Sequence, residues 1–147
     1  MTDKSTVNLA LIGIGAWSGS VGDAMMKSGK VNLVACFDPV PEKRKAFSDR
    51  FGCEEENSYE DILKRDDIDG LHLATPNSLH AEQTLLAARH RKHVFVEKPI
   101  ANTIEDGRKM IEACQKAGVV LMVGHQLRRL TGIRKVKELI EAGTIGS

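Results

Sequence analysis

The sequence predicts an α/β fold in which a doubly wound parallel sheet is flanked by helices on both faces. Two observations predict this class. Short, continuously apolar runs recur along the chain, as they do in parallel strands that are buried on both faces. Stretches with the apolar spacing of helices separate these runs, so crossover helices can join consecutive strands in parallel. The length of 147 residues, with 41% hydrophobic and 28% charged residues, is typical of one domain, predicted over 1–147.

Five strands are predicted from apolar runs that end at glycine or at polar residues. They are Val7–Ile12, Val31–Phe37, Gly70–Ala74, His93–Val96 and Val119–Val123. Each run has the length of an ordinary strand and is too short for a buried helix. The largest apolar run also falls well below the roughly 18 residues that a membrane-spanning helix needs.

Six helices are predicted between and after these strands, from apolar spacing and from end signals. They are one that carries Val21 and Met25 and ends near Gly29, Pro41–Phe51, a short one around Tyr59–Leu63, one from Asn77 to about Arg91, one from Thr103 to Gly118, and a last one at about 132–143. Asn77 and Thr103 are the predicted N-caps. The helix after Thr103 is predicted to bury Ile104, Ile111 and Cys114.

Charge and cysteine content exclude several classes of function. The net charge of +1 provides no general attraction for nucleic acid or for an anionic membrane. The three cysteines, Cys36, Cys53 and Cys114, are widely spaced and form no C-x-x-C motif, so neither a disulfide framework nor a metal site is predicted. Cys36 and Cys114 are expected in the core. Reduced cysteines favour a cytoplasmic protein.

The first strand ends in the glycine-rich stretch GIGAWSGSVG. Gly13 permits a tight turn and Gly15 lets the backbone approach a pyrophosphate, as in the Rossmann dinucleotide-binding fingerprint. The third glycine of the fingerprint falls at Ser18, a small residue that still allows the helix to lie close to the strand. Ala16, Trp17 and Ser18 lead into the first helix, whose N-terminus can bind a phosphate. A G-x-G turn also closes many βα units that bind no ligand.

Asp38 follows the second strand, where an acidic residue can accept hydrogen bonds from the adenosine ribose hydroxyls. Its charge repels a 2′-phosphate, so the predicted cofactor is NAD, with NADP possible because Lys43 and Arg44 lie nearby. The alternative role for Asp38 is a turn aspartate before Pro39.

Three motifs follow the later strands: TPNSLH at 75–80, EKP at 97–99 and GHQLRR at 124–129. In this order and spacing the chain resembles the Gfo/Idh/MocA family of oxidoreductases, from Val7 to Gly146. The resemblance implies that Thr75, Pro76 and Asn77 line the middle of the cofactor and that Gln126 reaches its nicotinamide side.

The resemblance also assigns roles to the EKP motif and to His80. It implies that Glu97 lies near the nicotinamide ribose and that Lys98 is the active-site lysine, which hydrogen-bonds the reacting hydroxyl of a sugar-like substrate. The peptide bond before Pro99 is often cis in such proteins. His80, the motif's histidine, is assigned to the cofactor site, although a histidine that bonds nearby backbone at a helix start is an equal alternative. In isolation, EKP is typical of a solvated turn.

The resemblance further implies a C-terminal α+β domain that carries a D-x-x-x-H pattern with the acid/base histidine. The 147 residues contain no D-x-x-x-H. We therefore expect the nucleotide-binding half of an NAD(P)-dependent dehydrogenase that acts on a hydroxyl of a sugar, inositol or related polyol. The isolated chain should bind the nicotinamide dinucleotide but be largely inactive, and exposed apolar surface could make it a homo-oligomer.

Two alternatives remain at this stage. A non-catalytic NAD-binding sensor or subunit needs the glycine loop and Asp38, but has no use for a lysine beside the nicotinamide. A methyltransferase that binds S-adenosylmethionine also has a glycine loop and an acid after the second strand, but nothing in it calls for TPNxxH together with EKP.

Overall fold

Six parallel strands form a single sheet in the order β3-β2-β1-β4-β5-β6. This computed structural model describes residues 6–145, so both ends of the predicted domain 1–147 lie outside the described residues. The strands are β1 (Val7–Ile12), β2 (Val31–Phe37), β3 (Glu54–Glu55), β4 (Gly70–Leu73), β5 (His93–Val96) and β6 (Leu121–Val123). The order reverses between β1 and β4, as in the Rossmann fold, which confirms the predicted class.

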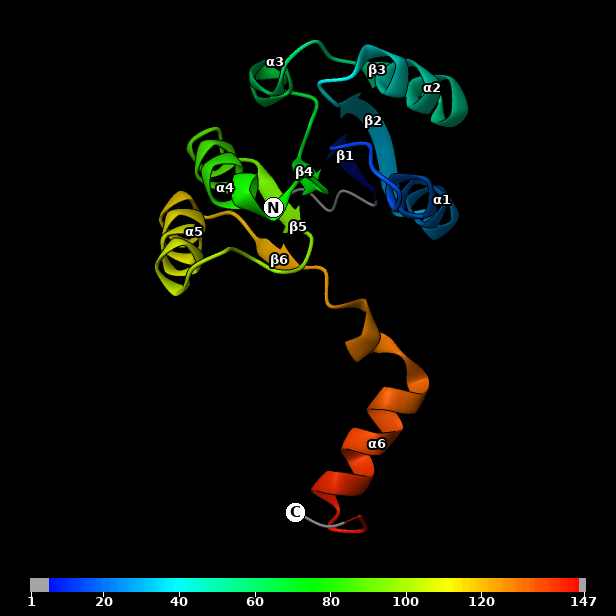
Figure 1. Cartoon of the computed structure of the whole chain (residues 1–147), viewed down its shortest axis with the longest axis vertical. Helices are drawn as coiled ribbons and strands as arrows, with labels where there is room; N and C mark the ends of the chain where they lie inside the picture. Colours follow the sequence, from blue (N-terminus) through cyan, green and yellow to red (C-terminus); the bar gives the residue numbers. More distant parts are fainter. Residues whose placement is uncertain (1–5, 146–147) are drawn as a thin grey trace.

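Helices cover the two faces of the sheet (Figure 1). On one face lie α1 (Ser18–Ser28) and α2 (Pro41–Phe51), and on the other lie α3 (Tyr59–Lys64), α4 (His80–Arg89) and α5 (Ile104–Ala117). Gly29, Gly52 and Gly118 end α1, α2 and α5 in left-handed conformations that glycine adopts without strain. Two hydrophobic clusters result, one for each face.

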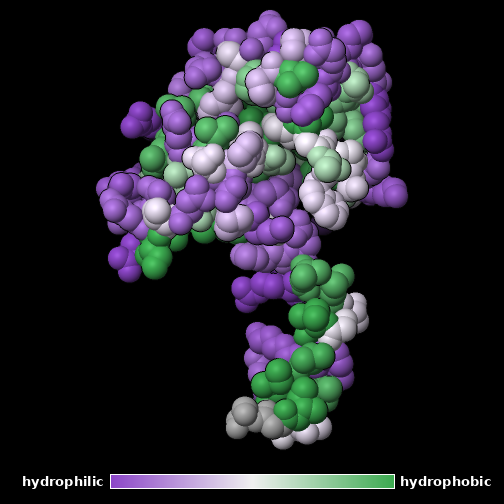
Figure 2. Space-filling view, in the orientation of Figure 1, coloured by the Kyte–Doolittle hydropathy of each residue, from purple (hydrophilic) through white to green (hydrophobic). Residues whose placement is uncertain are grey.

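The last helix, α6 (Thr131–Glu141), projects away from the sheet (Figure 1). A short 3₁₀ helix, η2 (Gln126–Arg129), leads into it. The helix begins and ends one or two residues before the predicted bounds of about 132–143. Its apolar side chains Ile133, Val136 and Ile140 are 46–51% exposed, and Figure 2 shows apolar side chains gathered along it.

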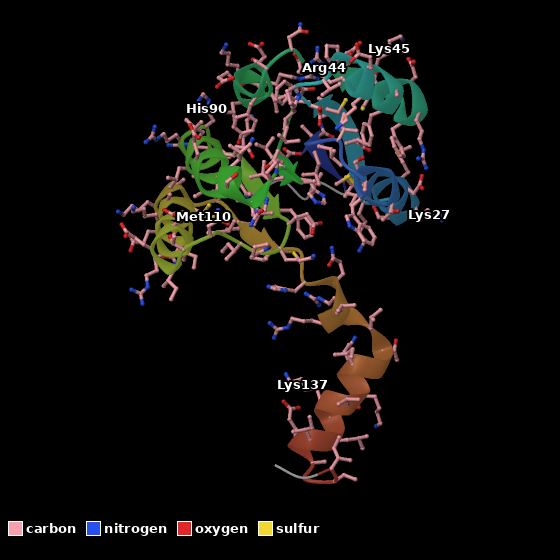
Figure 3. The ribbon with its side chains drawn as sticks, viewed as in Figure 1. Lys27, Arg44, Lys45, His90, Met110 and Lys137 are labelled. Carbon is pink, nitrogen blue, oxygen red and sulfur yellow. The ribbon has the colours of Figure 1, made fainter. Side chains whose placement is uncertain are left out.

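The predicted buried stripe of α5 was wrong for Ile104 and Ile111 and right for Cys114. Ile104 is 78% exposed and Ile111 is 45% exposed, while Gly107, Met110 and Cys114 face the core. Met110, labelled in Figure 3, is fully buried. The predicted cap at the start of this helix is confirmed, because the side chain of Thr103 accepts a hydrogen bond from the main-chain nitrogen of Asp106 at 3.0 Å.

Two further predictions need correction, and one about the cysteines is confirmed. Asn77 begins a 3₁₀ turn, η1 (Asn77–Leu79), and does not cap α4 with its side chain. The short edge strand β3 was not predicted, because its two exposed glutamates carry no apolar signal. All three cysteines are free and buried, including the expected Cys36 and Cys114.

Two absences can be stated for the described part of the chain. No helix within residues 6–145 has the length and apolar character needed to cross a membrane. In the same range no group of three or more histidine, cysteine, aspartate or glutamate side chains could hold a metal ion.

Candidate functional site

The carboxyl ends of β1, β4, β5 and β6 lie side by side at one edge of the sheet. Three main-chain hydrogen bonds join them at this edge: Ala74 N donates to Ile12 O at 2.8 Å, Glu97 N to Leu73 O at 2.9 Å, and Gly124 N to Val96 O at 2.8 Å. The glycine loop and the segments that carry the three motifs therefore emerge at the same edge, where open α/β sheets bind ligands.

A cleft of about 560 Å³ opens at this edge. Its volume lies in the range of sites for small molecules and cofactors. The predicted site residues that line it are Gly15, Ala16, Trp17, Ser18, Glu97, Lys98 and Gln126. The other lining residues are Ser20, Val21, Ala24, Ala74 and Leu127. The cleft thus joins the glycine loop and α1 to the EKP motif and to the loop after β6.

Gly13 and Gly15 have different roles in the glycine loop. Gly13 has a φ of 90°, and a Cβ there would lie 2.8 Å from the carbonyl of Ala74 and from the nitrogen of Thr75. Gly13 therefore allows the glycine loop to touch the loop after β4. A Cβ at Gly15 would meet nothing within 4 Å, so the backbone there faces open space in the cleft. This is the cradle that a pyrophosphate needs.

Ser18 and Gly22 share the packing role that the fingerprint gives to its third glycine. Ser18 is 4% exposed and its hydroxyl donates to Gly15 O at 2.7 Å, which fixes the turn into α1. A Cβ at Gly22 would lie 2.5 Å from the ring of Phe51, so α1 and α2 can approach only because this position is glycine. Gly22 lay inside a predicted helix, and a glycine at such a position is itself a signal of close packing.

Asp38 lies behind the glycine loop and is 6% exposed. Its carboxylate accepts hydrogen bonds from Ile14 N at 2.7 Å and from Val40 N at 2.9 Å. Arg44 donates from Nη1 to the main-chain oxygen of Asp38 at 2.9 Å. The side chain thus holds both the loop after β1 and the turn before α2, and each carboxylate oxygen keeps a lone pair for a further donor.

Glu97 is the centre of a polar group at the end of β5. His72 Nε2 lies 3.2 Å from Glu97 Oε1, and Gln126 Nε2 lies 3.4 Å from both carboxylate oxygens. A Cβ at Gly124 would lie 3.1 Å from Glu97 Oε2, so the loop after β6 also closes on this carboxylate. The orientation of Glu97 is therefore set from three sides.

His72 lies inside β4, and its contact with Glu97 was not predicted from the sequence. The side chain is 2% exposed and its ring meets the ring of Phe95 edge-on, with centroids 4.6 Å apart. Burial lowers the pKa of His72, and the attraction of Glu97 opposes that shift only in part. The neutral ring can donate one N–H to Glu97. In the sequence, the only sign of this contact is a polar residue inside an apolar strand.

Lys98 is exposed and its side chain lines the cleft next to Glu97. Within residues 6–145 no hydrogen bond or ion pair engages its ammonium group, so the amine is available to a ligand. The Lys98–Pro99 peptide bond is cis, as the resemblance implied.

The residues of the TPNxxH motif lie beside the cleft and do not line it. Thr75 Oγ1 donates to Gln83 Oε1 at 2.6 Å, and Asn77 Nδ2 donates to Asn102 Oδ1 at 2.8 Å. Pro76 is exposed, whereas His80 is 1% exposed. His80 therefore lies behind the cleft, where both of its ring nitrogens contact main-chain carbonyl oxygens.

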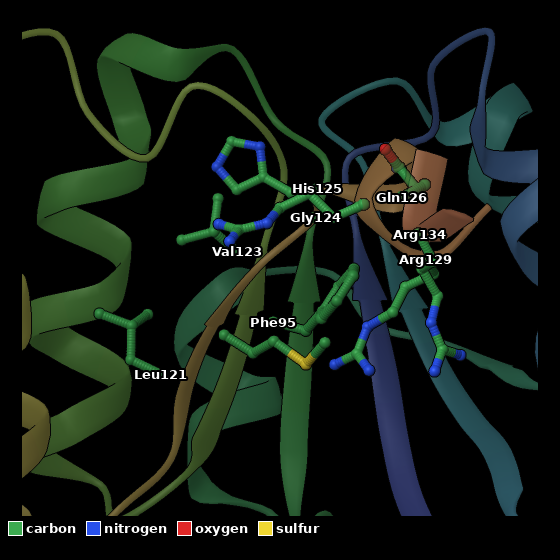
Figure 4. A pocket seen from close by; sticks show the side chains of 10 residues that line it. Phe95, Leu121, Val123, Gly124, His125, Gln126, Arg129 and Arg134 are labelled. Atoms are coloured by element: carbon green, nitrogen blue, oxygen red, sulfur yellow. The ribbon is translucent and has the colours of Figure 1, made fainter. Parts of the chain in front are cut away.

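A second cavity of about 800 Å³, shown in Figure 4, lies next to the first. Gln126 lines both cavities. Phe95 and Met122 supply apolar surface from β5 and β6. Three arginines also line it, and Figure 4 shows two of them, Arg129 and Arg134, on one side of the cavity. No carboxylate lines this cavity, so its polar side is positively charged.

Comparison with protein-family models gives one match. A model named GFO_IDH_MocA, described as an oxidoreductase family with an NAD-binding Rossmann fold, matches residues 7–125. These residues include every predicted site residue except Gln126. The match therefore covers the glycine loop, Asp38 and the TPNxxH and EKP motifs.

Two named enzymes are similar in sequence. The chain is 36% identical over 141 residues to 2,7-anhydro-N-acetylneuraminate hydratase of Mediterraneibacter gnavus. The aligned region covers 96% of the chain and 37% of that protein. The chain is 38% identical over 107 residues to levoglucosan dehydrogenase of Pseudarthrobacter phenanthrenivorans, which covers 72% of the chain and 27% of that protein.

Two solved structures have the same fold. WlbA dehydrogenase from Bordetella pertussis, in complex with NADH and UDP-GlcNAcA, superposes with a TM-score of 0.91 at 37% identity, over 97% of this chain and 41% of that one. The second is KijD10, a 3-ketoreductase from Actinomadura kijaniata in complex with TDP-benzene and NADP. It superposes with a TM-score of 0.90 at 26% identity, over 97% of this chain and 45% of that one. The chain thus spans less than half the length of each of these relatives.

Proposed function

The chain belongs to the Gfo/Idh/MocA oxidoreductase family, and from that premise we propose that it is the nucleotide-binding part of an NAD(P)-dependent oxidoreductase. The proposed substrate is a sugar, an inositol or a related polyol, on which the enzyme acts at a hydroxyl group. Among the relatives are a levoglucosan dehydrogenase and a 1,5-anhydro-D-fructose reductase. The observation that carries the proposal is the single cleft that joins the glycine loop to Glu97 and Lys98.

Residues at this edge of the sheet would contact successive parts of a nicotinamide dinucleotide. The backbone at Gly15 and the N-terminus of α1 would bind the pyrophosphate. Asp38 would accept hydrogen bonds from the adenosine ribose, and Glu97 and Gln126 would border the nicotinamide ribose. The nicotinamide ring, when bound, supplies the hydride acceptor or donor.

Lys98 is the proposed catalytic residue. Its ammonium group would donate a hydrogen bond to the oxygen of the reacting hydroxyl or carbonyl group and stabilise negative charge that develops there. Glu97 is held by His72 and Gln126, so the residue directly before Lys98 is fixed at the rim of the cleft. A merely NAD-binding sensor has no use for a lysine at this position.

NAD is the proposed cofactor, with NADP as the alternative. The carboxylate of Asp38 would repel a 2′-phosphate. Arg44, which could favour one, instead donates to the main chain of Asp38. Similar structures have been solved with NADH and with NADP, so the fold itself does not decide between the two cofactors. Parallel titration with NADH and NADPH measures which of them this chain prefers.

The proposal is tested by calorimetric titration with NADH together with a turnover assay. The 147-residue chain should bind NADH and should have little dehydrogenase activity on a panel of inositols and aldoses. The absence of binding to NADH and NADPH would contradict the cofactor site. A substantial rate from these residues alone would contradict the expectation that further residues supply the acid/base group.

Two remaining parts of the proposal concern the state of the protein. We expect a cytoplasmic protein, on the basis of its free cysteines. The half-exposed apolar side chains of α6 favour self-association in the isolated chain, which sedimentation velocity would detect as a dimer or larger species.

A further inference from the structure

His80 joins the two loops that flank the candidate cofactor cleft. Its ring is 1% exposed. Nε2 lies 3.0 Å from the carbonyl oxygen of Thr75, and Nδ1 lies 3.0 Å from the carbonyl oxygen of Pro99. The first oxygen belongs to the loop after β4, and the second belongs to the residue directly after Lys98. One side chain therefore spans two loops that come from different strands.

Both partners of the ring are acceptors, so His80 must act as a hydrogen-bond donor. A neutral imidazole carries one N–H and can donate to one of the two carbonyls, whereas an imidazolium can donate to both. Hydrogen bonds to both carbonyls therefore need an N–H on each ring nitrogen, and neither nitrogen is then free for a ligand. A buried carbonyl that loses such a donor costs free energy, so the ring favours the conformation in which both loops are held at this separation.

Among the described residues, the start of α4 is the buried link between the two loops, and the exposed hydrogen bond from Asn77 Nδ2 to Asn102 Oδ1 at 2.8 Å is a second one. His80 is the first residue of α4, and the core holds this helix through the fully buried Thr84 and Ala87. The glycine loop in turn rests on the first of the two loops, because Gly13 leaves no room for a Cβ against Ala74 and Thr75. The ring thus fixes the position of Pro99, and therefore of Lys98, relative to the glycine loop.

We propose that His80 is a positioning residue, which sets the place of Lys98 relative to the glycine loop by bonding the carbonyls of Thr75 and Pro99, and that it does not contact the cofactor. The proposal rests on the proposed function for the importance of Lys98. The bridge between the two loops is a property of the cofactor-free chain and can be measured without any ligand.

The experiment compares three variants by the amide NMR signals of the cofactor-free protein. The amide group of His80→Asn can replace the donor at Nδ1, and that of His80→Gln can replace the donor at Nε2. We expect His80→Asn to leave the signals of Lys98 and Ile100 near their wild-type positions while those of Thr75 and Asn77 move. His80→Gln should give the opposite pattern, and His80→Leu should move both pairs.

NADH binding gives the second measurement. His80→Leu should bind NADH about tenfold more weakly, which corresponds to about 1.4 kcal/mol, and His80→Asn should recover most of that affinity. The matched control is Leu86→Ala, a destabilising change on the same helix at a side chain packed on the core, which should leave NADH affinity within about twofold of wild type.

The outcomes separate this proposal from the proposed function. If wild type does not bind NADH but the crossed NMR pattern appears, the cofactor assignment fails and the bridge stands. If wild type binds NADH but all three variants move both pairs of signals alike, or move neither, the positioning role is overturned. It is also overturned if Leu86→Ala weakens NADH binding as much as His80→Leu.

Discussion

Replacement of Gly13 by alanine would place a methyl group where two loops touch. A Cβ at this position would lie 2.8 Å from the carbonyl carbon and oxygen of Ala74 and from the nitrogen of Thr75. These are main-chain atoms at the end of β4, which cannot rotate aside as the tip of a side chain can. The substitution must therefore move the loop after β4, on which the glycine loop rests.

Two free-energy terms add at Gly13. Its φ of 90° costs an L-residue about 1–2 kcal/mol, and overpacking against fixed atoms costs about 1–3 kcal/mol. The free energy of unfolding should therefore fall by about 2–5 kcal/mol. Gly29 isolates the first term, because its φ is 62° and nothing lies within 4 Å of its Cβ position. Gly29→Ala should cost about 1–2 kcal/mol.

Gly15→Ala is the matched control within the glycine loop. Its Cβ would meet nothing within 4 Å and its φ is not positive, so the free energy of unfolding should change by less than about 0.5 kcal/mol. The added methyl group enters the space that a pyrophosphate must occupy. NADH should therefore bind about tenfold more weakly or worse, a loss of about 1.4 kcal/mol.

Urea denaturation measures the first quantity and NADH titration measures the second. The expected pattern is a large loss of stability for Gly13→Ala, a smaller one for Gly29→Ala, and a loss of affinity without a loss of stability for Gly15→Ala. Equal stability of Gly13→Ala and Gly29→Ala would refute the contact between the loops. Unchanged affinity of Gly15→Ala would refute the path assigned to the cofactor.

Four other substitutions test the remaining parts of the site. Lys98→Ala should change the free energy of unfolding by less than about 0.5 kcal/mol, since the side chain is exposed, and a large loss measured by denaturation would show a structural role instead. Asp38→Ala leaves two main-chain N–H groups without their acceptor, which should lower the free energy of unfolding by about 1–3 kcal/mol for each group that stays buried. The same substitution should reduce the ratio of NADH affinity to NADPH affinity in parallel titrations. Burial lowers the pKa of His72 below its ordinary value of 6.5, so as the pH falls His72 takes up a proton in the unfolded chain before it does so in the folded chain. The free energy of unfolding should therefore decline below pH 6.5. His72→Phe should remove this part of the pH dependence. Glu97→Gln should lower the midpoint of His72 in an NMR titration, and a midpoint above 6.5 in wild type would contradict the account.

The order of the elements could be predicted from sequence, but the buried face of one helix could not. In α5 the predicted stripe was Ile104, Ile111 and Cys114, and the structure leaves the two isoleucines exposed. The core instead takes Gly107, Met110 and Cys114, which have the spacing i, i+3, i+7 of a single helix face. Gly107 has no side chain, so the apolar pattern of the sequence gives no sign that this position faces the core.

The segments that meet at this edge of the sheet were predicted better than the contacts between them. The order of strands and loops was enough to place Gly15, Lys98 and Gln126 at one edge, because carboxyl ends of parallel strands meet there. Glu97 is 25 residues from its partner His72, and Pro99 is 19 residues from His80, whose other partner, Thr75, is five residues away. Such contacts depend on how loops from different strands approach each other, which no local pattern encodes.

The central claim is that a nicotinamide dinucleotide runs from the glycine loop to Glu97 and Lys98, and Trp17 reports on it directly. Trp17 is the single tryptophan of the chain, is 74% exposed and lines the cleft. Titration with NADH should quench its fluorescence saturably, with energy transfer to the nicotinamide, and NAD⁺ should reverse the signal. A tryptophan signal that does not saturate, or that Gly15→Ala leaves unchanged, would contradict the claim.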